Sequence, residues 1–441
     1  MASITLNPTG QNTLAHSVSG GSNYSVLADD SDSSYIYKDA TTSNTTTTSV
    51  FQIGNSSSIG GRFRITGIST TIRNKNGISG MNTSSMAANL FIGGIEGTSW
   101  SCSLSTSWSN RSHTSNVSEF SNLNGKVLTS LPQILLHIAT TLRVSKTGSN
   151  KWNGASKASV TLTYDNLYSQ SAQGSTGVST SLSNSGSSVN GYYISGTTTT
   201  YTATLSNGYG FKGWFTNSSG TGTAVSTNLV YSETCNSDRT LYAIAFTVSV
   251  SGSTGVSASV SRGSDGRTFT FTGTLTNGYD FDGWYNGSSK VSSSNPYSVT
   301  LSSNTSLTAK ANRHIYNISA VGDAHCTATV SSSDNYYGTV ATFTATMSDS
   351  SYLFDGWYND SSFTSLYSSS MTTTYTITSD KTLYVKTKSK SKFFIKTNGQ
   401  WTEVIKAYRK VGGSWQLLST DDYSGIFSTT DNLLKDDNRV H

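Results

Sequence analysis

A motif of the form Phe-x-Gly-Trp occurs three times in this chain, and no other feature constrains the fold as strongly. The three copies end at Trp214, Trp284 and Trp357, so that successive copies lie 70 and 73 residues apart. A fixed period of this length is typical of tandem structural modules. With 441 residues, the chain is long enough for three such modules and for further domains on either side of them.

Alternating sequences surround each copy of the motif. On the N-terminal side, apolar residues alternate with threonine, as expected for a strand with one buried face. On the C-terminal side, each copy closes on a second alternating segment, with an aspartate or asparagine two residues before it. The upstream segments are Tyr201–Leu205, Phe269–Leu275 and Phe343–Met347, and the closing segments are Thr240–Ala243, Ser306–Ala309 and Thr382–Val385, preceded by Asp238, Asn304 and Asp380. We therefore predict three β-rich modules that repeat strand by strand.

The start of each module is less regular than its end. The first two modules share the opening Ser-Thr-Gly-Val-Ser, at Ser175–Ser179 and Ser253–Ser257. The third has Ala324–Val330 at this place and departs from the pattern.

The aromatic residues of the motif have two interpretations. A module of about 70 residues has little core, and one buried aromatic side chain covers roughly 150–250 Å², worth about 4–6 kcal/mol. We therefore predict that the motif fills the module core, while an exposed platform for stacking sugars or bases remains the alternative. The residues concerned are Phe211, Trp214, Phe281, Trp284, Phe354 and Trp357.

The composition predicts an all-β fold. Charged residues make up only 12% of the chain, whereas aromatic residues make up 11% and recur in alternating segments. The net charge of +5 is spread along the chain and does not indicate a nucleic-acid partner. Cys102, Cys235 and Cys326 lie in different segments without Cys-x-x-Cys spacing, so we expect buried thiols, no metal site and no cofactor.

The repeats resemble the divergent internalin-type B-repeat, a small β-rich module of bacterial surface proteins. The resemblance rests on the Thr-rich strand, the Gly-Tyr-x-Phe-x-Gly-Trp sequence and the closing Asp-x-Thr-Leu-Tyr-Ala sequence, and it covers residues 167–388. We place the three modules at 167–246, 247–313 and 314–388. The resemblance implies a spacer or adhesion module without catalytic activity.

Residues 1–166 have the pattern of a β-sandwich, with short strands between Gly-, Ser- and Asn-rich segments. The segment Leu135–Val144 is apolar enough to be central, and we expect His137 within it to be a core residue. One helical turn is expected within Asn122–Pro132. The candidate strands are Ile4–Leu6, Ser34–Tyr37, Ser49–Ile53, Phe63–Ile72, Ala87–Ile92, Ser101–Trp108, Leu135–Val144 and Ser159–Tyr164.

Three tryptophans of this segment, Trp100, Trp108 and Trp152, are candidates for stacking on a sugar if they are exposed, and core residues otherwise. The acidic run Asp29–Asp32 lacks the glycine and glutamate of a calcium loop and is interpreted as a solvated loop. The segments Asp29–Ile36, Arg62–Arg73 and Ala158–Tyr164 resemble the jelly-roll-type sandwich at the front of tailed-phage structural proteins. This resemblance implies carbohydrate binding or a role in assembly.

Residues 389–441 contain a second repeat with an offset of 14 residues. Asn398-Gly399 and Gly412-Gly413 join alternating segments and predict two hairpins, which must pack on each other, on the third module or on a partner subunit. This paired Gly-x-Trp hairpin also resembles the tail end of phage appendage proteins. In the preceding run Lys386–Lys392, lysine alternates with small polar residues, which predicts a protected edge strand or, as the alternative, contact with an anionic surface.

The sequence offers no established catalytic motif. It has no nucleophile elbow at the required spacing, no phosphate loop and no His-Glu-x-x-His. A sugar-cleaving carboxylate pair remains open, but Asp282 and Asp355 of the motif are replaced by Lys212 in the first copy. We therefore expect no enzyme, no catalytic residue and no cofactor.

The N-terminus has no basic and apolar signal sequence, and no apolar run is long enough to span a membrane. Together with the two phage resemblances, this leads us to expect a structural protein of a tailed-phage virion, made in the host cytoplasm. It would project as a fibre, decoration or tail appendage and adhere to a host surface glycan. Its partners would be other virion proteins and further copies of itself, such as a trimer. The alternatives are a bacterial cell-surface adhesin with spacer modules and a polysaccharide-degrading appendage.

Overall fold

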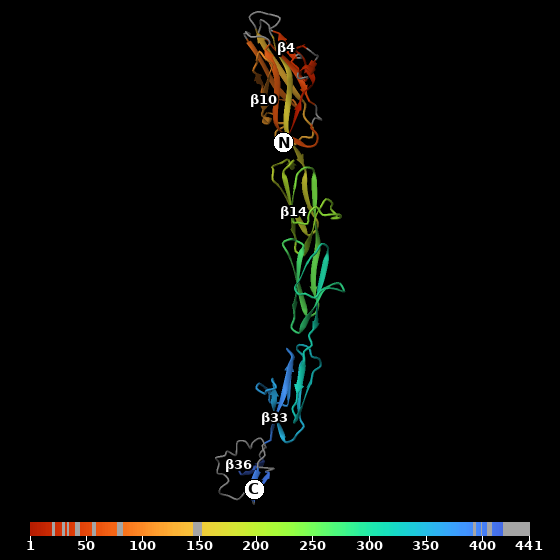
Figure 1. The fold of residues 1–441 in the computed structure, drawn as a ribbon, viewed down its shortest axis with the longest axis vertical. Helices are drawn as coiled ribbons and strands as arrows, with labels where there is room; N and C mark the ends of the chain where they lie inside the picture. The colour runs from red at the N-terminus through yellow and green to blue at the C-terminus, as the bar shows by residue number, and fades with distance from the viewer. Residues whose placement is uncertain are drawn as a thin grey trace. The chain divides into compact units, whose positions relative to one another are not determined.

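The computed structural model describes residues 1–19, 23–28, 31–32, 35–39, 45–54, 59–76, 83–143, 152–390, 394–397, 399–403 and 408–417. Nearly all of these residues lie in β-strands and the turns that join them, and their only helical segments are two short 3₁₀ helices, η1 (Asn23–Leu27) and η2 (Val117–Glu119). The prediction of an all-β fold is confirmed (Figure 1). The chain divides into two compact units, Met1–Val248 with Gly263–Thr268 and Leu301–Asn304, and the remainder.

The first unit begins with a two-sheet β-sandwich. In one sheet, β6 (Phe63–Asn76) lies between β10 (Ser109–Ser115) and β12 (Trp152–Tyr168), and β12 also pairs with β1 (Ala2–Leu6) and β4 (Tyr35–Asp39), which pairs with β3 (Ser17–Ser19). In the other, β11 (Ile134–Arg143) lies between β5 (Thr45–Ile53) and β7 (Thr83–Ile92), extended by β2 (Pro8–Thr13), β8 (Ile95–Glu96) and β9 (Trp100–Cys102). The predicted central position of the 135–144 segment is confirmed for its described part.

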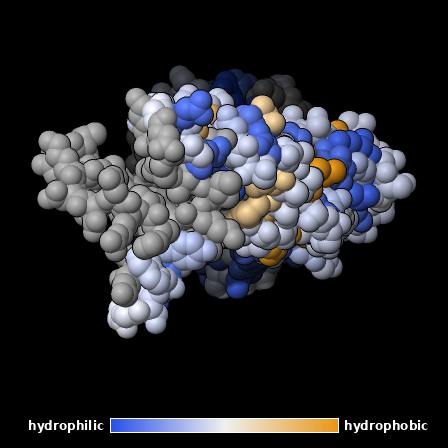
Figure 2. All heavy atoms as spheres, turned by 90° about the horizontal axis from the view of Figure 1, so that it is seen from below, coloured by the Kyte–Doolittle hydropathy of each residue, from blue (hydrophilic) through white to orange (hydrophobic). Residues whose placement is uncertain are grey.

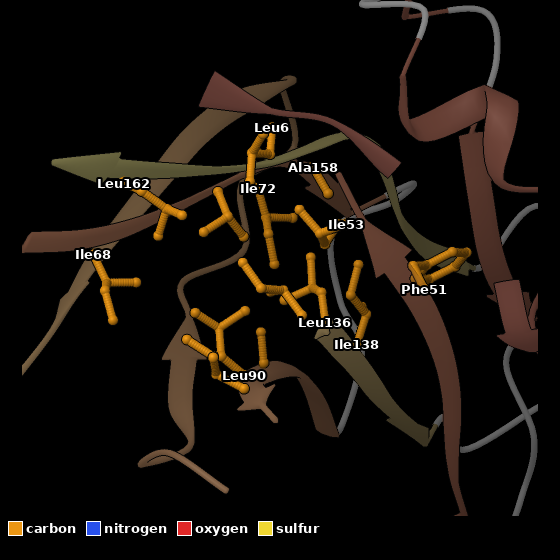
Figure 3. Packing of buried hydrophobic residues seen from close by; sticks show 14 of the residues in the cluster. Leu6, Phe51, Ile53, Ile68, Ile72, Leu90, Leu136, Ile138, Ala158 and Leu162 are labelled. Atoms are coloured by element: carbon orange, nitrogen blue, oxygen red, sulfur yellow. The ribbon is translucent and has the colours of Figure 1, made fainter. Parts of the chain in front are cut away.

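Apolar side chains from both sheets fill the space between them. Figure 3 shows Leu6, Ile68, Ile72, Ala158 and Leu162 of the first sheet facing Phe51, Ile53, Leu90, Leu136 and Ile138 of the second, and all are almost fully buried. This one core therefore accounts for the alternating apolar residues of both sheets.

A polar network lies within this sandwich as well. His16 is 5% exposed, its Nδ1 lies 2.7 Å from Oγ of Ser49, and its Nε2 lies 2.8 Å from Oγ1 of Thr140. The Ser49 hydroxyl also accepts the backbone N–H groups of Ala15 and His16. Burial, and secondarily the charge of Lys38, lowers the pKa of His16 to about 4, so the imidazole is neutral at physiological pH.

Two expectations for the sandwich are corrected, and one strand of it was not predicted. The predicted strand Ser101–Trp108 is wrong, because β9 ends at Cys102 and the next strand begins at Ser109. Strand β10 (Ser109–Ser115) has an entirely polar sequence and gives no alternation of apolar residues. His137 is half-buried on the outer face of β11, where its ring stacks on Phe91 at 4.2 Å.

The segment expected to hold a helical turn, Asn122–Pro132, contains none of the helical residues. A hydrogen-bonded turn lies just before and within its first residues, with the Asn124 N–H donating to the Phe120 carbonyl. A further turn follows, in which the Lys126 N–H donates to the Leu123 carbonyl, and Leu128 then forms an isolated bridge with Phe63.

Each repeat forms a smaller two-sheet sandwich with a common strand order. In the first, one sheet holds β13 (Gln170–Gly174), β20 (Arg239–Gly252) and β18 (Tyr209–Phe215), and the other holds β14 (Val178–Asn184), β17 (Thr198–Leu205) and β19 (Val230–Thr234). A short hairpin, β15 (Ser188–Val189) and β16 (Tyr192–Ile194), joins β14 to β17 and pairs with the end of β12.

The third repeat and most of the second belong to the second unit, and both follow the same plan. One has β26 (Thr305–Arg313), β23 (Tyr279–Asn286) and β24 (Ser289–Ser292) against β21 (Val256–Arg262), β22 (Thr268–Leu275) and β25 (Tyr297–Thr300). The other has β27 (Ile318–Val321), β33 (Lys381–Ser389), β30 (Tyr352–Tyr358) and β31 (Leu366–Ser368) against β28 (Cys326–Ser331), β29 (Val340–Met347) and β32 (Thr372–Thr376).

In the first and third repeats the opening strand runs parallel to the closing strand. The pairs are β13 with β20 and β27 with β33. Hydroxyl pairs link the two strands, at 2.8 Å between Ser171 and Thr240 and at 2.7 Å between Ser319 and Thr382. In the second repeat, Ser249 at the end of β20 donates in the same way to Ser306 of β26.

The prediction of an edge strand is confirmed for the described part of the lysine run. Strand β33 pairs with β30 as far as Ser389, whereas β27 pairs with it only as far as Tyr384, so among the described strands Lys386 and Lys388 have a neighbour on one side only. Beyond that point Lys386 and Lys388 form ion pairs with Asp355. Lys392 lies outside the described residues.

Two hairpins follow, as predicted. They consist of β34 (Phe394–Thr397) with β35 (Gln400–Glu403), and β36 (Tyr408–Val411) with β37 (Ser414–Leu417). Gly412 and Gly413 both have positive φ, the backbone that a primed two-residue turn requires. On the face shown in Figure 2, polar residues predominate and hydrophobic residues form small separate patches.

Candidate functional site

The aromatic residues of the repeat motif lie in the module cores. Trp214, Trp284 and Trp357 are fully buried, as is Phe211, while Phe281 and Phe354 are half-buried. Each Phe meets its Trp edge-on, at 6.0, 5.7 and 6.2 Å between ring centroids in successive modules. An aromatic residue of the facing sheet contacts each Trp from another side, namely Tyr201, Phe271 and Phe343. In this arrangement no tryptophan of the motif is accessible to a ligand.

The glycine of the motif allows a neighbouring strand or loop to approach closely. A Cβ at Gly283 would lie 2.7 Å from the carbonyl oxygen of Ser292, and one at Gly213 would lie 2.9 Å from that of Ser226. The register of strand pairing also shifts immediately before the glycine in all three modules, which marks a β-bulge. The residue between Phe and Gly therefore occupies the bulge.

The bulge residue takes part in a local network. Asp282 accepts hydrogen bonds from the Tyr285 hydroxyl at 2.6 Å and from Lys290 at 3.1 Å, and the tyrosine hydrogen bond contributes most to lowering the pKa of this carboxyl. Asp355 accepts in the same way from the Tyr358 hydroxyl. In the first module Lys212 donates instead to the Gly220 carbonyl. Each carboxylate is thus held by its own module, as in a structural ion pair.

The repeated aspartate or asparagine ties the start of each module to its end. The side-chain oxygen of Asp238 accepts the N–H of Ser169 at 2.8 Å, and that of Asp380 accepts the N–H of Asn317 at 2.8 Å. In the second module Asn304 accepts the N–H of Thr247 at 2.9 Å. We call these three hydrogen bonds the module latches. Asp238 also pairs with Arg62 of the sandwich.

The opening of the third module differs from that of the first two because a different group packs on the tyrosine ring at the corresponding position. A Cβ at Gly177 or Gly255 would lie 2.1 Å from the ring of Tyr209 or Tyr279, and both glycines have positive φ. In the third module His325 takes this place, and its ring stacks on Tyr352 at 3.5 Å between centroids. The departure from the pattern therefore replaces a backbone–ring contact with a ring–ring contact.

Two of the three candidate tryptophans of the sandwich lie together. The rings of Trp108 and Trp152 are 6.1 Å apart, and Tyr35 lies 5.5 Å from Trp108 and stacks on Trp152 at 4.8 Å. Tyr37 meets Trp152 edge-on at 6.2 Å. We call these four half-buried residues the aromatic face. Tyr35 and Tyr37 were not among the residues predicted to bind a sugar, although their spacing of two along one strand places both side chains on the same side of the sheet.

Charged groups border the aromatic face. The ammonium of Lys75 lies 5.8 Å from the ring centroid of Trp108. Asp39 is exposed and lies directly across the strand pair from Trp152. Arg73 forms a two-point ion pair with Asp32, at 2.5 and 2.7 Å, and this hydrogen bonding lowers the pKa of the Asp32 carboxyl.

Trp100 lies elsewhere. It belongs to β9 of the other sheet, packs against the sandwich core and stacks on His113 at 5.1 Å. It therefore closes the rim between the two sheets and is not part of the aromatic face.

The described residues contain no group of three or more side chains that could hold a metal ion. Cys102, Cys235 and Cys326 are unpaired and buried, and burial raises the pKa of Cys102 to about 12. None of the described helices has the length and hydropathy of a membrane span.

The three repeats match two families of known repeat domains. The Listeria–Bacteroides repeat domain matches residues 181–244 and 322–386, and the divergent InlB B-repeat domain matches residues 242–313. The resemblance of the three modules to internalin-type repeats is thereby confirmed. These domains indicate a repeat-containing surface protein.

Comparison of whole chains adds little. No curated protein sequence matches this chain significantly. Among solved structures, the glycoside hydrolase domain of Endo-D from Streptococcus pneumoniae R6 matches over 62% of this chain and 34% of that chain, with 10% identity and a TM-score of 0.20. The chain thus spans about a third of that structure, and the similarity is too low to bear on activity.

Proposed function

We propose that this repeat-containing surface protein is a non-enzymatic structural component of a tailed-phage particle, in which the three modules are spacers between an N-terminal sandwich and C-terminal hairpins. The observation that carries the spacer role is that the residues of the repeat motif and of the latch all have a structural role within their own module. The motif Phe and Trp fill the module core, the glycine accommodates a β-bulge, and the repeated Asp or Asn forms the latch.

The phage location is supported by the two ends of the chain. The 62–73 segment, which resembles part of a phage jelly-roll sandwich, forms the central strand β6, and the C-terminal repeat that resembles phage appendage proteins forms two hairpins. Isolated two-stranded hairpins are marginally stable in water. Phe394, Trp401, Tyr408 and Trp415 on these hairpins are 44–67% exposed. We propose that other virion proteins or further copies of this chain, as in a trimer, cover them.

The second candidate function is a bacterial cell-surface adhesin with spacer modules, and the matched repeat domains favour it. The two candidates differ in location and not in the role of the modules. A role in polysaccharide cleavage has no support in the carboxylates of the motif, because Asp282 and Asp355 belong to different modules and each is held by its own tyrosine.

Mass spectrometry of purified phage particles and of the host cell envelope distinguishes the candidates. A structural virion protein is expected in particles at a fixed ratio to the major capsid protein, with a high ratio for a capsid decoration and a low one for a tail or neck appendage. Its absence from particles and presence in the envelope fraction would overturn the phage proposal in favour of the adhesin.

A further inference from the structure

We infer that the aromatic face of the sandwich is a saccharide-binding site, in which Tyr37, Trp108 and Trp152 stack on sugar rings and Lys75 and Asp39 bind their polar substituents. The inference deepens the proposed role at a surface and rests on it only for the biological source of the glycan. Three observations support it: the four rings point away from the sandwich core, they pack on one another, and charged groups border them.

The register of the strands places the rings on the outer side of the sheet. Ile36 and Ala155 are directly paired and belong to the sandwich core. Because side chains alternate along a strand, Tyr35 and Tyr37 on either side of Ile36 point away from that core. Gly154 of β12 pairs with Tyr37 of β4 on one side and with Lys75 of β6 on the other. Tyr37 and Lys75 therefore share one row on the outer face.

The middle of this row carries no side chain. A Cβ at Gly154 would lie 2.2 Å from the carbonyl oxygen of Ile36 and 3.1 Å from Cβ of Tyr37, so only glycine fits there. Trp152 lies two residues before Gly154 on β12, and the ring centroid of Trp108 is 6.1 Å from that of Trp152. Gly154 therefore adds no side chain to the row between Tyr37 and Lys75.

The four rings are not needed to complete the sandwich. The core on the other side of the sheet is already closed by apolar side chains, among them Ile36, Ile72 and Ala158. Neither Trp108 nor Trp152 packs against this core, whereas Trp100 and Tyr164 do. All four rings of the face are half-buried, so each keeps part of its surface in contact with solvent.

The border of the face matches the chemistry of a sugar. Sugar rings present C–H groups to an aromatic surface and hydroxyl groups around their edge, so they require aromatic rings flanked by hydrogen-bonding groups. Asp39 is exposed beside Trp152 and can accept hydroxyl protons. The ammonium of Lys75 lies beside the ring of Trp108 and interacts electrostatically with Asp32, and its N–H groups can donate to a ring oxygen, a hydroxyl or an acidic sugar substituent.

A saccharide fits this surface better than a protein partner does. A stable protein interface buries about 800 Å² on each side and has an apolar centre. Here only four half-buried rings are available, and charged groups border them on the sides of Lys75, Asp39 and the Arg73–Asp32 ion pair. A small aromatic surface with a charged border is typical of sites for polar ligands.

The test uses the full chain on a printed array of neutral and acidic bacterial polysaccharides. The variants are Trp108→Ala, Trp152→Ala and Lys75→Ala, and the control is Trp415→Ala, which removes an exposed tryptophan from a C-terminal hairpin. The wild type and the control are expected to bind the same polysaccharides. Each tryptophan variant is expected to weaken binding by at least about tenfold, a change readily resolved by titration calorimetry with the best polysaccharide.

Two further measurements keep the test decisive. Thermal melting identifies any variant that fails to fold, and Lys75→Ala probes the site without removing a ring. Its effect is expected to be larger for acidic than for neutral polysaccharides. Absence of binding to every polysaccharide, or binding that the Trp108, Trp152 and Lys75 variants leave unchanged, would overturn the inference. Because purified protein is used, either result is independent of whether the chain occurs in phage particles.

Discussion

Replacement of Trp357 by alanine should unfold the third module and leave the other two intact. The side chain is fully buried, and replacing a buried tryptophan by alanine costs about 3–5 kcal/mol. Its Nε1–H also donates to the Met371 carbonyl at 3.3 Å, and the variant loses this hydrogen bond, at a further cost of about 1 kcal/mol, while the carbonyl still accepts the N–H of Ala345. Nε1 of Trp214 and of Trp284 has no acceptor among the described residues, so this second cost is specific to the third module.

These magnitudes are large for a module of this size. At about 0.05–0.15 kcal/mol per residue, some 70 residues provide about 4–10 kcal/mol of unfolding free energy. A loss of about 4–6 kcal/mol removes between about two-fifths and all of this. The variant module should therefore be largely unfolded in low concentrations of urea, at which the wild-type module remains folded.

Hydrogen exchange followed by mass spectrometry can measure the free energy of unfolding of each module separately in the full chain. Leu366→Ala is the matched control, because Leu366 belongs to the same module and is 55% exposed, and it should change the free energy of unfolding by less than about 0.5 kcal/mol. Peptides from the first two modules provide an internal reference. Equal protection of the third module in Trp357→Ala and Leu366→Ala would refute the assignment of Trp357 as the main core residue.

Two further predictions concern a buried histidine and the latches. Because burial lowers the pKa of His16 from 6.5 to about 4, protonation favours the unfolded chain, and about 3 kcal/mol of stability present above pH 6.5 should be lost as the pH falls towards 4. Urea unfolding at pH 7 and pH 4.5 should show this loss in the wild type and a smaller one in His16→Gln; equal losses would contradict it. Replacing Asn304 or Asp380 by alanine should cost about 1 kcal/mol and speed hydrogen exchange of the Thr247 or Asn317 amide, respectively, and unchanged exchange of these amides would argue against the latches.

The repeats were predictable because each strand has one buried face. Alternation of apolar residues with threonine indicates the buried face of a strand directly, and the same alternation recurs in all three repeats at a nearly constant spacing. Strand β10 (Ser109–Ser115) was missed for the converse reason. Its inward positions at the sheet edge, Arg111 and His113, are polar, so the sequence carries no alternation of hydropathy.

The contacts that define the latches and the aromatic face could not be predicted in the same way. Asp238, Asn304 and Asp380 are visible as a repeated position, but each binds a backbone N–H group 57–69 residues earlier, and a backbone amide has no sequence signature. The aromatic face joins Tyr35 to Trp108 and Trp152 through the pairing of distant strands. Trp100 could not be separated from them until the two sheets were distinguished.

The parallel pairing of opening and closing strands determines how a module responds to tension. When a chain is pulled from both ends, the opening strand is drawn backwards and the closing strand forwards, so the two slide along each other. The evenly spaced hydrogen bonds between β27 and β33 are then loaded together, whereas a pair pulled apart from one end would break them in sequence. Forced unfolding is governed by the height of the unfolding barrier, and shear of this kind raises that barrier. The first and third modules are thus built to resist shear, and the latch holds one end of the sheared strand pair in each.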